Sequence, residues 1–302
     1  MAGLFIKYFI KGNIINFFYG IIRVEVECMG FSKVKKFTLH LVGRVRENET
    51  TALAAQLSYF LILSVFPFLI FLLTLITYTP LSQEHILQQL SLLLPDTAFN
   101  LVRQIVGEVF DASNATLLSV GFLATLWTAS RSTFAVIRGI NKAYGTKETR
   151  SFIKLNIVGI VVTLALALII IFTLSFLVFG RAIGIMVFET FGLEITFHYI
   201  WPLLRYLIPL LIIFGVLSFL YSFSPNISLR FKNVYVGAIF ATLGWILASQ
   251  AFAFYVNNFG QFTRIYGSLG GIIVFLLWLY ISSMVILLGG ELNATIAHFK
   301  NT

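Results

Sequence analysis

Residues 52–78 read ALAAQLSYFLILSVFPFLIFLLTLITY, and this 27-residue stretch contains no Asp, Glu, Lys or Arg. At about 1.5 Å of rise per residue, a helix of this length measures roughly 40 Å, which exceeds the roughly 30 Å of hydrocarbon in a bilayer. A helix in a soluble core rarely needs such a long uncharged run. We therefore predict that this stretch is the first transmembrane helix, and that lipid is the solvent around the domain.

The composition of the whole chain agrees with a membrane protein. Of the 302 residues, 59% are hydrophobic and 11% are charged, whereas soluble domains carry roughly 25% charged residues. The single cysteine, Cys28, excludes an intramolecular disulfide and a cysteine-rich metal site. The four histidines are far apart and lack a ligand-type spacing. We therefore predict neither a bound metal nor a cofactor.

Five further apolar segments resemble the first one. They predict an all-α integral membrane protein with six transmembrane helices, at about 52–78, 116–137, 153–180, 199–223, 234–256 and 270–297. Residues 79–115 read as an outer amphipathic loop, and residues 31–302 as one membrane domain. Residues 1–30 are apolar but contain Lys7 and Lys11, so they predict an arm that lies on the membrane surface, with a seventh span as the alternative.

The basic residues assign an orientation to these spans. In the predicted topology, 17 of the 21 basic residues fall on one side, and only Arg103, Arg181, Arg205 and Arg264 fall on the other. Lys and Arg accumulate in cytoplasmic loops. We therefore predict that both termini lie in the cytoplasm. This distribution also explains the net charge of +9 without nucleic acid, and the basic segment 31–51 suits contact with anionic lipid headgroups.

An internal repeat is suggested by two similar segments. ATLWTAS at 124–130 resembles ATLGWILAS at 241–249, and the third and sixth predicted spans begin about the same distance apart. Six spans would then form two sets of three in opposite orientations, as in many secondary transporters. The alternative is chance similarity between apolar helices.

Several stretches together resemble the YihY/BrkB family of bacterial inner-membrane proteins. They are TALAAQLSYF at 51–60, Phe66-Pro67, FSP at 223–225, GAIFA at 237–241, IYGSLG at 265–270, LLWLY at 276–280 and LGGE at 288–291. The resemblance covers about residues 34–298. The resemblance implies a six-helix protein of the bacterial inner membrane. A transport role is commonly supposed for the family, which also carries an old ribonuclease label.

Glu291 is the sharpest candidate for a functional residue. It lies on the last predicted helix and shares a face with Tyr280 at helical spacing. A carboxylate in that position needs a cation, water or a proton. We predict an ion pair with Arg131 or Arg138 of the second span. The alternative is a carboxylate in water at the cytoplasmic interface.

Other polar residues could line a central cavity: Gln56, Tyr59, Arg131, Gln250 and Asn257. Isolated polar side chains in spans also often bond neighbouring helices only. Kinks or hinges are expected at Pro67 and Pro209, where a backbone donor is missing. Gly267, Gly270 and Gly271 would allow close backbone approach or a broken helix at the start of the last span.

Three functions fit these features. The first is a transporter or flippase for an anionic or lipid-linked substrate. The second is a membrane scaffold or envelope assembly factor, which could also form a homo-oligomer. The third is a membrane-bound hydrolase, but the 12 acidic residues are scattered and provide no clustered metal ligands. We therefore predict that the protein is not an enzyme, and that its main partners are membrane lipids.

Overall fold

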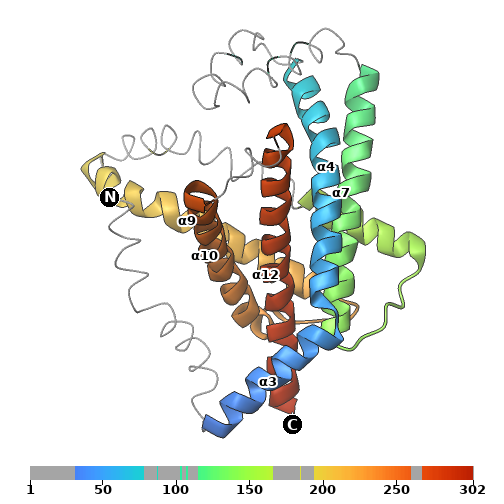
Figure 1. Ribbon diagram of the computed structural model, residues 1–302, viewed down its shortest axis with the longest axis vertical. Helices are drawn as coiled ribbons and strands as arrows, with labels where there is room; N and C mark the ends of the chain where they lie inside the picture. Colours follow the sequence, from blue (N-terminus) through green and yellow to red (C-terminus); the bar gives the residue numbers. More distant parts are fainter. Residues whose placement is uncertain are drawn as a thin grey trace. The chain divides into compact units, whose positions relative to one another are not determined.

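The structure is a computed structural model that describes residues 31–77, 115–165, 194–259 and 267–301, together with the isolated positions 87, 103, 107 and 184. Within these ranges all the regular structure is helical. The helices are α3 (Phe31–Glu47), α4 (Thr50–Thr77), α7 (Ala115–Ala143), Phe152–Ala165, α9 (Glu194–Phe223), α10 (Tyr235–Phe259) and α12 (Gly270–Asn301), with short 3-10 helices η1 (Phe231–Asn233) and η2 (Gly267–Leu269) (Figure 1).

Four of the described helices are long and apolar enough to cross a membrane. They contain the segments Thr50–Phe71, Leu118–Ala143, Tyr235–Val256 and Gly270–Lys300. The shorter apolar helix Phe152–Ala165 and the apolar segment Leu207–Phe223 of α9 lie within the predicted third and fourth spans. The helical class is thus confirmed, and four of the predicted spans correspond to helices that are long and apolar enough to cross a membrane. The complete set of six spans and the placement of the termini stay predictions.

The helix boundaries differ from those predicted in an informative way. α7 continues to Ala143, so Arg138 and Lys142 belong to the helix and not to the loop after it. α4 runs through Pro67 as one helix. Helices often extend beyond the hydrocarbon, where Lys and Arg side chains reach the interface. The arm at 1–30, residues 166–180 of the third span and all of the loop at 79–115 except positions 87, 103, 107 and 115 lie outside the described residues.

The chain divides into two compact units. One comprises residues 1–55, 136–150 and 166–302, and the other comprises residues 56–135 and 151–165. The first unit therefore holds α3, α9, α10 and α12 with the last two turns of α7, and we call it the C-terminal unit. The second holds most of α4 and α7 with the helix Phe152–Ala165, and we call it the N-terminal unit.

The N-terminal unit is held by close contacts at small residues. Gly121 of α7 lies against the backbone of Phe71 in α4, and the rings of Phe71 and Phe122 are 5.4 Å apart. Where α7 meets the helix Phe152–Ala165, the hydroxyls of Thr133 and Thr163 are 3.0 Å apart and share a hydrogen bond. Small residues and hydroxyl pairs are typical of helix contacts in lipid, where apolar burial between helices gives little driving force.

The C-terminal unit is built on α12, which contacts α10, α9 and α3. Indole donors join α10 and α12 in both directions, from Trp245 to Ser282 over 3.1 Å and from Trp278 to Ser249 over 3.2 Å. Tyr221 of α9 donates to the carbonyl of Ile286 in α12 over 2.6 Å. These bonds satisfy polar groups that lipid cannot satisfy.

Helix α3 lies against the C-terminal end of α12 (Figure 1). The ring of Phe37 packs 5.5 Å from that of Phe299, and His40 stacks on His298 with 4.8 Å between ring centroids. Burial and the neighbouring charge of His298 lower the pKa of His40. Because α3 is near the start of the described chain and α12 at its end, these contacts bring the two together at one end of the unit.

Candidate functional site

Glu291 occupies the centre of a buried polar site in the C-terminal unit. It lies 21 residues into α12, roughly 31 Å from the start of that helix, and its side chain is 2% exposed. One carboxylate oxygen, Oε1, accepts hydrogen bonds from Asn48 Nδ2 over 2.8 Å and from Thr50 Oγ1 over 3.3 Å. The other, Oε2, is 3.6 Å from Arg44 Nε. We call these four residues the Glu291 site.

The turn between α3 and α4 delivers Asn48 and Thr50 to this carboxylate. Asn48 and Glu49 close the last turn of α3 by donating to the carbonyls of Arg44 and Arg46. Glu49 then adopts a left-handed conformation with φ of 53°, and its carbonyl accepts from Ala52 and Leu53 at the start of α4. A left-handed residue is common where a chain leaves a helix. Here it bends the chain at Glu49, so that the side chains on either side of it, those of Asn48 and Thr50, both reach Glu291.

The pairing of Glu291 with Arg44 is close but loose. A separation of 3.6 Å places opposite charges in contact, yet it exceeds the usual length of a hydrogen bond. Glu291 Oε2 and Arg44 Nε each lack a hydrogen-bond partner among the described residues. Burying a carboxylate costs several kcal/mol unless a counter-charge and hydrogen bonds offset it. The two opposite charges therefore attract each other, but Glu291 Oε2 remains an acceptor without a donor and Arg44 Nε remains a donor without an acceptor.

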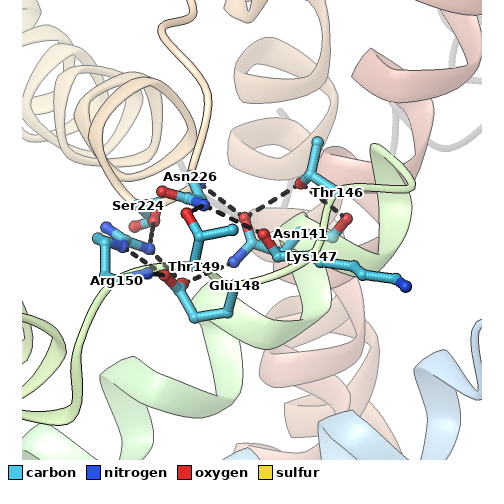
Figure 2. A network of polar contacts seen from close by, with 8 residues as sticks. All are labelled: Asn141, Thr146, Lys147, Glu148, Thr149, Arg150, Ser224 and Asn226. Atoms are coloured by element: carbon cyan, nitrogen blue, oxygen red, sulfur yellow. Dashed lines mark hydrogen bonds and ion pairs between the residues drawn. The ribbon is translucent and has the colours of Figure 1, made fainter.

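A second polar network lies in the same unit (Figure 2). Arg150 grips the carboxylate of Glu148 with two bonds, Nε to Oε1 over 2.7 Å and Nη2 to Oε2 over 2.6 Å. Arg150 Nη2 also donates to the carbonyl of Ser224, at the end of α9, over 3.0 Å. Asn141 of α7 donates to Glu148 Oε2 over 2.9 Å. The segment after α7 is thereby fixed to both helices.

Asn226 completes this network from the segment after α9. Its backbone amide donates to Asn141 Oδ1 over 2.7 Å, and its side-chain amide donates to Thr149 Oγ1 and to the carbonyl of Lys147. Figure 2 shows the Asn141 and Asn226 side chains pointing toward one another from different elements. Two loops that are far apart in sequence thus share one set of hydrogen bonds.

The electrostatics of the two accessible carboxylates follow from their partners. The hydrogen bond from Arg150, with its positive charge, lowers the pKa of Glu148 below its ordinary value. The same holds for Glu49, whose exposed carboxylate pairs with Lys142 over 2.9 Å. A carboxylate with a lowered pKa stabilises the fold above its ordinary pKa, and it loses that contribution as the pH falls through the lowered value. Both pairs therefore persist at neutral pH.

The structure pairs Glu291 with a cation that was not predicted. The paired cation is Arg44 of α3, whereas Arg138, which belongs to the same unit, has an exposed side chain on α7. Arg131 belongs to the N-terminal unit, where its guanidinium lies 4.3 Å from the ring centre of Trp127 and 5.5 Å from that of Phe134. Glu291 is 2% exposed, so its carboxylate is not open to solvent, and its placement relative to the cytoplasmic interface stays a prediction. Arg44 belongs to the basic segment 31–51, which lies outside the predicted spans.

The other residues predicted for a cavity differ in exposure. Tyr59 and Gln250 are exposed, while Gln56 and Tyr280 are partly buried. The side chain of Asn257 lies outside the described residues. Of the predicted hinges, Pro67 and Pro209 both lie within continuous helices. Gly267 has a left-handed φ of 57° at the start of η2, and Gly270 begins α12 with Gly271 next to it. The roles proposed for these residues stay predictions.

Sequence reasoning missed the residues of the three connecting segments that hold the Glu291 site and the network of Figure 2. They are Asn48 and Thr50 in the α3–α4 turn, Asn141, Glu148 and Arg150 around the end of α7, and Asn226 after α9. A usable signal was present, because each lies directly beside a predicted span on the same predicted side. No group of three or more His, Cys, Asp or Glu that could hold a metal occurs in the described part of the chain.

Comparison with known proteins gives a consistent result. A family model described as Virulence factor BrkB matches residues 41–302. The chain is 41% identical over 258 residues to the Putative ribonuclease-like protein YfkH of Bacillus subtilis, covering 85% of this chain and 94% of that protein. It is 26% identical over 275 residues to a UPF0761 membrane protein of Tolumonas auensis, covering 88% and 87%, and 29% identical over 275 residues to one of Aeromonas salmonicida, covering 87% and 90%. No solved structure matches significantly.

Proposed function

The chain belongs to the Virulence factor BrkB family of membrane proteins, and from that premise we propose that it moves an anionic or lipid-linked substrate across the bacterial inner membrane. The observation that carries the proposal is Glu291, a carboxylate buried inside an apolar helix and faced by Arg44. Ionisable groups within membrane helices are expensive and commonly mark substrate or ion pathways.

The Glu291 site would serve as the inner gate of such a transporter. Its contacts join α12 to α3 and to the start of α4, so an opening movement of α3 has to break them. The loose Arg44 contact lowers the cost of breaking this attachment. Alternating access requires contacts at one end of the bundle that can separate and re-form.

The same contacts support the proposed orientation. α3 packs against the C-terminal end of α12, so the beginning and the end of the described chain meet. Lys and Arg are in excess in the segments near this contact, so we expect the contact between α3 and the end of α12 to lie on the cytoplasmic side. The relatives named UPF0761 membrane proteins come from bacteria, which supports placement in a bacterial membrane.

Reconstitution of the full chain into liposomes tests the proposal. Two probes are used: fluorescently labelled phosphatidylglycerol, read by dithionite quenching, and entrapped glycerol 3-phosphate, read by release. We expect protein-dependent movement of one probe, slowed about tenfold in Glu291→Gln, because the neutral amide removes the charge that holds Arg44 and the contact then no longer re-forms to close the gate in each cycle. The exposed carboxylate Glu47 provides the control Glu47→Gln, which should match the unaltered protein.

A failure of both probes to move would contradict the transport proposal. It would favour the second candidate, a non-transporting scaffold, which has one specific observation behind it: α10 and α12 pack backbone to backbone at Gly237 and Gly289, as in a rigid bundle. The protein named ribonuclease-like among the relatives keeps a hydrolase as a third alternative. Cleavage of added RNA by the purified chain would favour it over our proposal that the chain is not an enzyme.

A further inference from the structure

Arg131 places a cation in the middle of the predicted second span. It lies between Leu118 and Ala143, the ends of the apolar segment of α7, and is roughly 20 Å from either end. Its guanidinium lies 4.3 Å from the ring centre of Trp127, one turn earlier, and 5.5 Å from that of Phe134, about one turn later. Because it contacts rings on both sides of its own turn, the guanidinium stays at that level and does not extend toward either end of the helix.

The N–H donors of this guanidinium have no acceptor within the described part of the chain. A guanidinium carries five such donors. The carboxylates of the described ion pairs, those of Glu49, Glu148 and Glu291, belong to the C-terminal unit and pair with other cations. The neighbouring hydroxyls of Ser130 and Ser132 donate to carbonyls of their own helix. Ring contacts offset only part of the cost of a charge in an apolar span, so the arrangement calls for an acceptor from outside the chain.

Two rings of different exposure flank the guanidinium. Phe134 is buried, and its ring lies against Gly159 of the helix Phe152–Ala165, where an added Cβ would overlap it. Trp127 is 60% exposed, so its ring belongs to the surface of the N-terminal unit. Arg131 is only partly buried between them. Its position is therefore fixed from the inner side, while a ligand can approach its donors from the surface.

The surface next to Trp127 is apolar. Leu123, one turn before Trp127, and Val120, two turns before it, are both exposed. Residues at these spacings share one face of a helix. A cation without a counter-charge beside an exposed apolar face matches a molecule with an anionic head and apolar chains. An anionic phospholipid has both parts, whereas a soluble phosphate would make no use of the apolar face.

We propose that Arg131, held against Trp127, binds the phosphate of an anionic phospholipid whose chains lie along Leu123 and Val120. The planar guanidinium can donate two parallel hydrogen bonds to phosphate oxygens while its face remains on the indole. Headgroups and water can reach this depth because a bilayer thins locally around a buried arginine.

This lipid site goes beyond the proposed function because binding here requires no transport. It also lies in the N-terminal unit, whereas the Glu291 site lies in the C-terminal unit. A negative transport result would leave the lipid site standing, and a negative binding result would leave the transport proposal standing.

Quenching of tryptophan emission by brominated lipids reports this site, because Trp127 is part of it. The full chain and Trp127→Phe are reconstituted into phosphatidylcholine vesicles that contain equal fractions of either brominated phosphatidylglycerol or brominated phosphatidylcholine. The difference in emission between the two chains is the signal of Trp127, and phenylalanine retains a ring for Arg131 to contact. We expect brominated phosphatidylglycerol to quench this signal at least about twofold more strongly, because its headgroup carries a net negative charge.

Variants at Arg131 assign this preference to its charge. Arg131→Gln should remove the preference for phosphatidylglycerol. Arg131→Lys should keep most of it, because an ammonium group retains the charge but loses the two-bond geometry. Each variant is also combined with Trp127→Phe to isolate the signal of Trp127. The matched control Lys147→Gln removes one exposed positive charge after α7 and should leave the preference unchanged.

Three results would overturn the lipid site. The first is equal quenching by the two brominated lipids in the unaltered chain, a comparison that needs no substitution at Arg131. The second is a preference for phosphatidylglycerol that persists in Arg131→Gln. The third is a loss of preference in Lys147→Gln as large as that in Arg131→Gln, which would assign the effect to general charge.

Discussion

At the scale of single residues, Glu49 determines how the chain passes from α3 to α4. Its φ of 53° is unusual for a residue with a side chain, and its side chain is exposed. The conformation matters because the two neighbouring residues, Asn48 and Thr50, both donate to Glu291. A backbone position with no buried contact of its own therefore controls the geometry of the Glu291 site.

A matched pair of substitutions tests this role. Glu49→Gly and Glu49→Val both remove the exposed pair with Lys142, so they differ mainly in tolerance of a left-handed backbone. Glycine adopts this conformation freely, whereas a β-branched residue strongly avoids it. We expect Glu49→Val to lower the thermal midpoint of the purified protein by a few degrees more than Glu49→Gly. Equal midpoints would show that the turn is not under this constraint.

Glu291 and its partner Arg44 differ in how well the sequence predicts them. Glu291 could be identified because a carboxylate within an apolar run is costly wherever the helix packs. Its partner could not, because Arg44 lies 247 positions earlier in the chain and only the packing of α3 on α12 brings them together. Its place within a predicted span favours Arg131 as the partner of Glu291, but the guanidinium of Arg131 is stacked on Trp127.

At the scale of elements, the contact between α10 and α12 depends on two glycines. A Cβ on Gly289 would meet the hydroxyl of Tyr221 and the carbonyl oxygen of Gly237. A Cβ on Gly237 would meet the carbonyl oxygen of Gly289 and the side-chain amide of Asn293. The backbones are therefore too close for any side chain between them. This is the small-residue packing expected where lipid offers no apolar driving force.

Gly289→Ala should destabilise the protein by about 2 kcal/mol, because one extra methyl group must push two helices apart. The matched control is Gly215→Ala in α9, where a Cβ would meet nothing within 4 Å. Alanine favours a helix more than glycine does, so this control should leave stability unchanged or slightly raised. Unfolding of the two variants in denaturant, compared with the original chain, measures both effects. Equal stabilities would mean that the helices are not in backbone contact.

Elements were more predictable than contacts because each depends on a local pattern. The uncharged runs identified α4, α10 and α12 to within a few residues. The predicted second span ends at residue 137, before Arg138 and Lys142, whereas α7 continues to Ala143 and carries both residues in its last two turns. The glycine contacts and the indole–serine bonds depend on which faces meet, and no pattern within one helix specifies that.

At the scale of the whole molecule, the orientation in the membrane is the prediction on which the proposed function rests. Glu291 lies 21 residues into the 32-residue helix α12, nearer to its C-terminal end. The distribution of basic residues assigns this end to the cytoplasm. Placement of the same site outside the cell would expose the gate to a different set of ligands.

Cysteine labelling in intact cells decides the orientation. Cys28, the single cysteine, is first replaced by serine, and single cysteines are then introduced as Lys147→Cys after α7 and Ser268→Cys in η2, just before α12. With a membrane-impermeant maleimide, we expect Ser268→Cys to react in intact cells and Lys147→Cys to react only after permeabilisation, because the predicted α12 span separates η2 from the C-terminal end that contacts α3. Labelling of Lys147→Cys in intact cells, with Ser268→Cys protected, would invert the topology. It would then place the Glu291 site on the outer face.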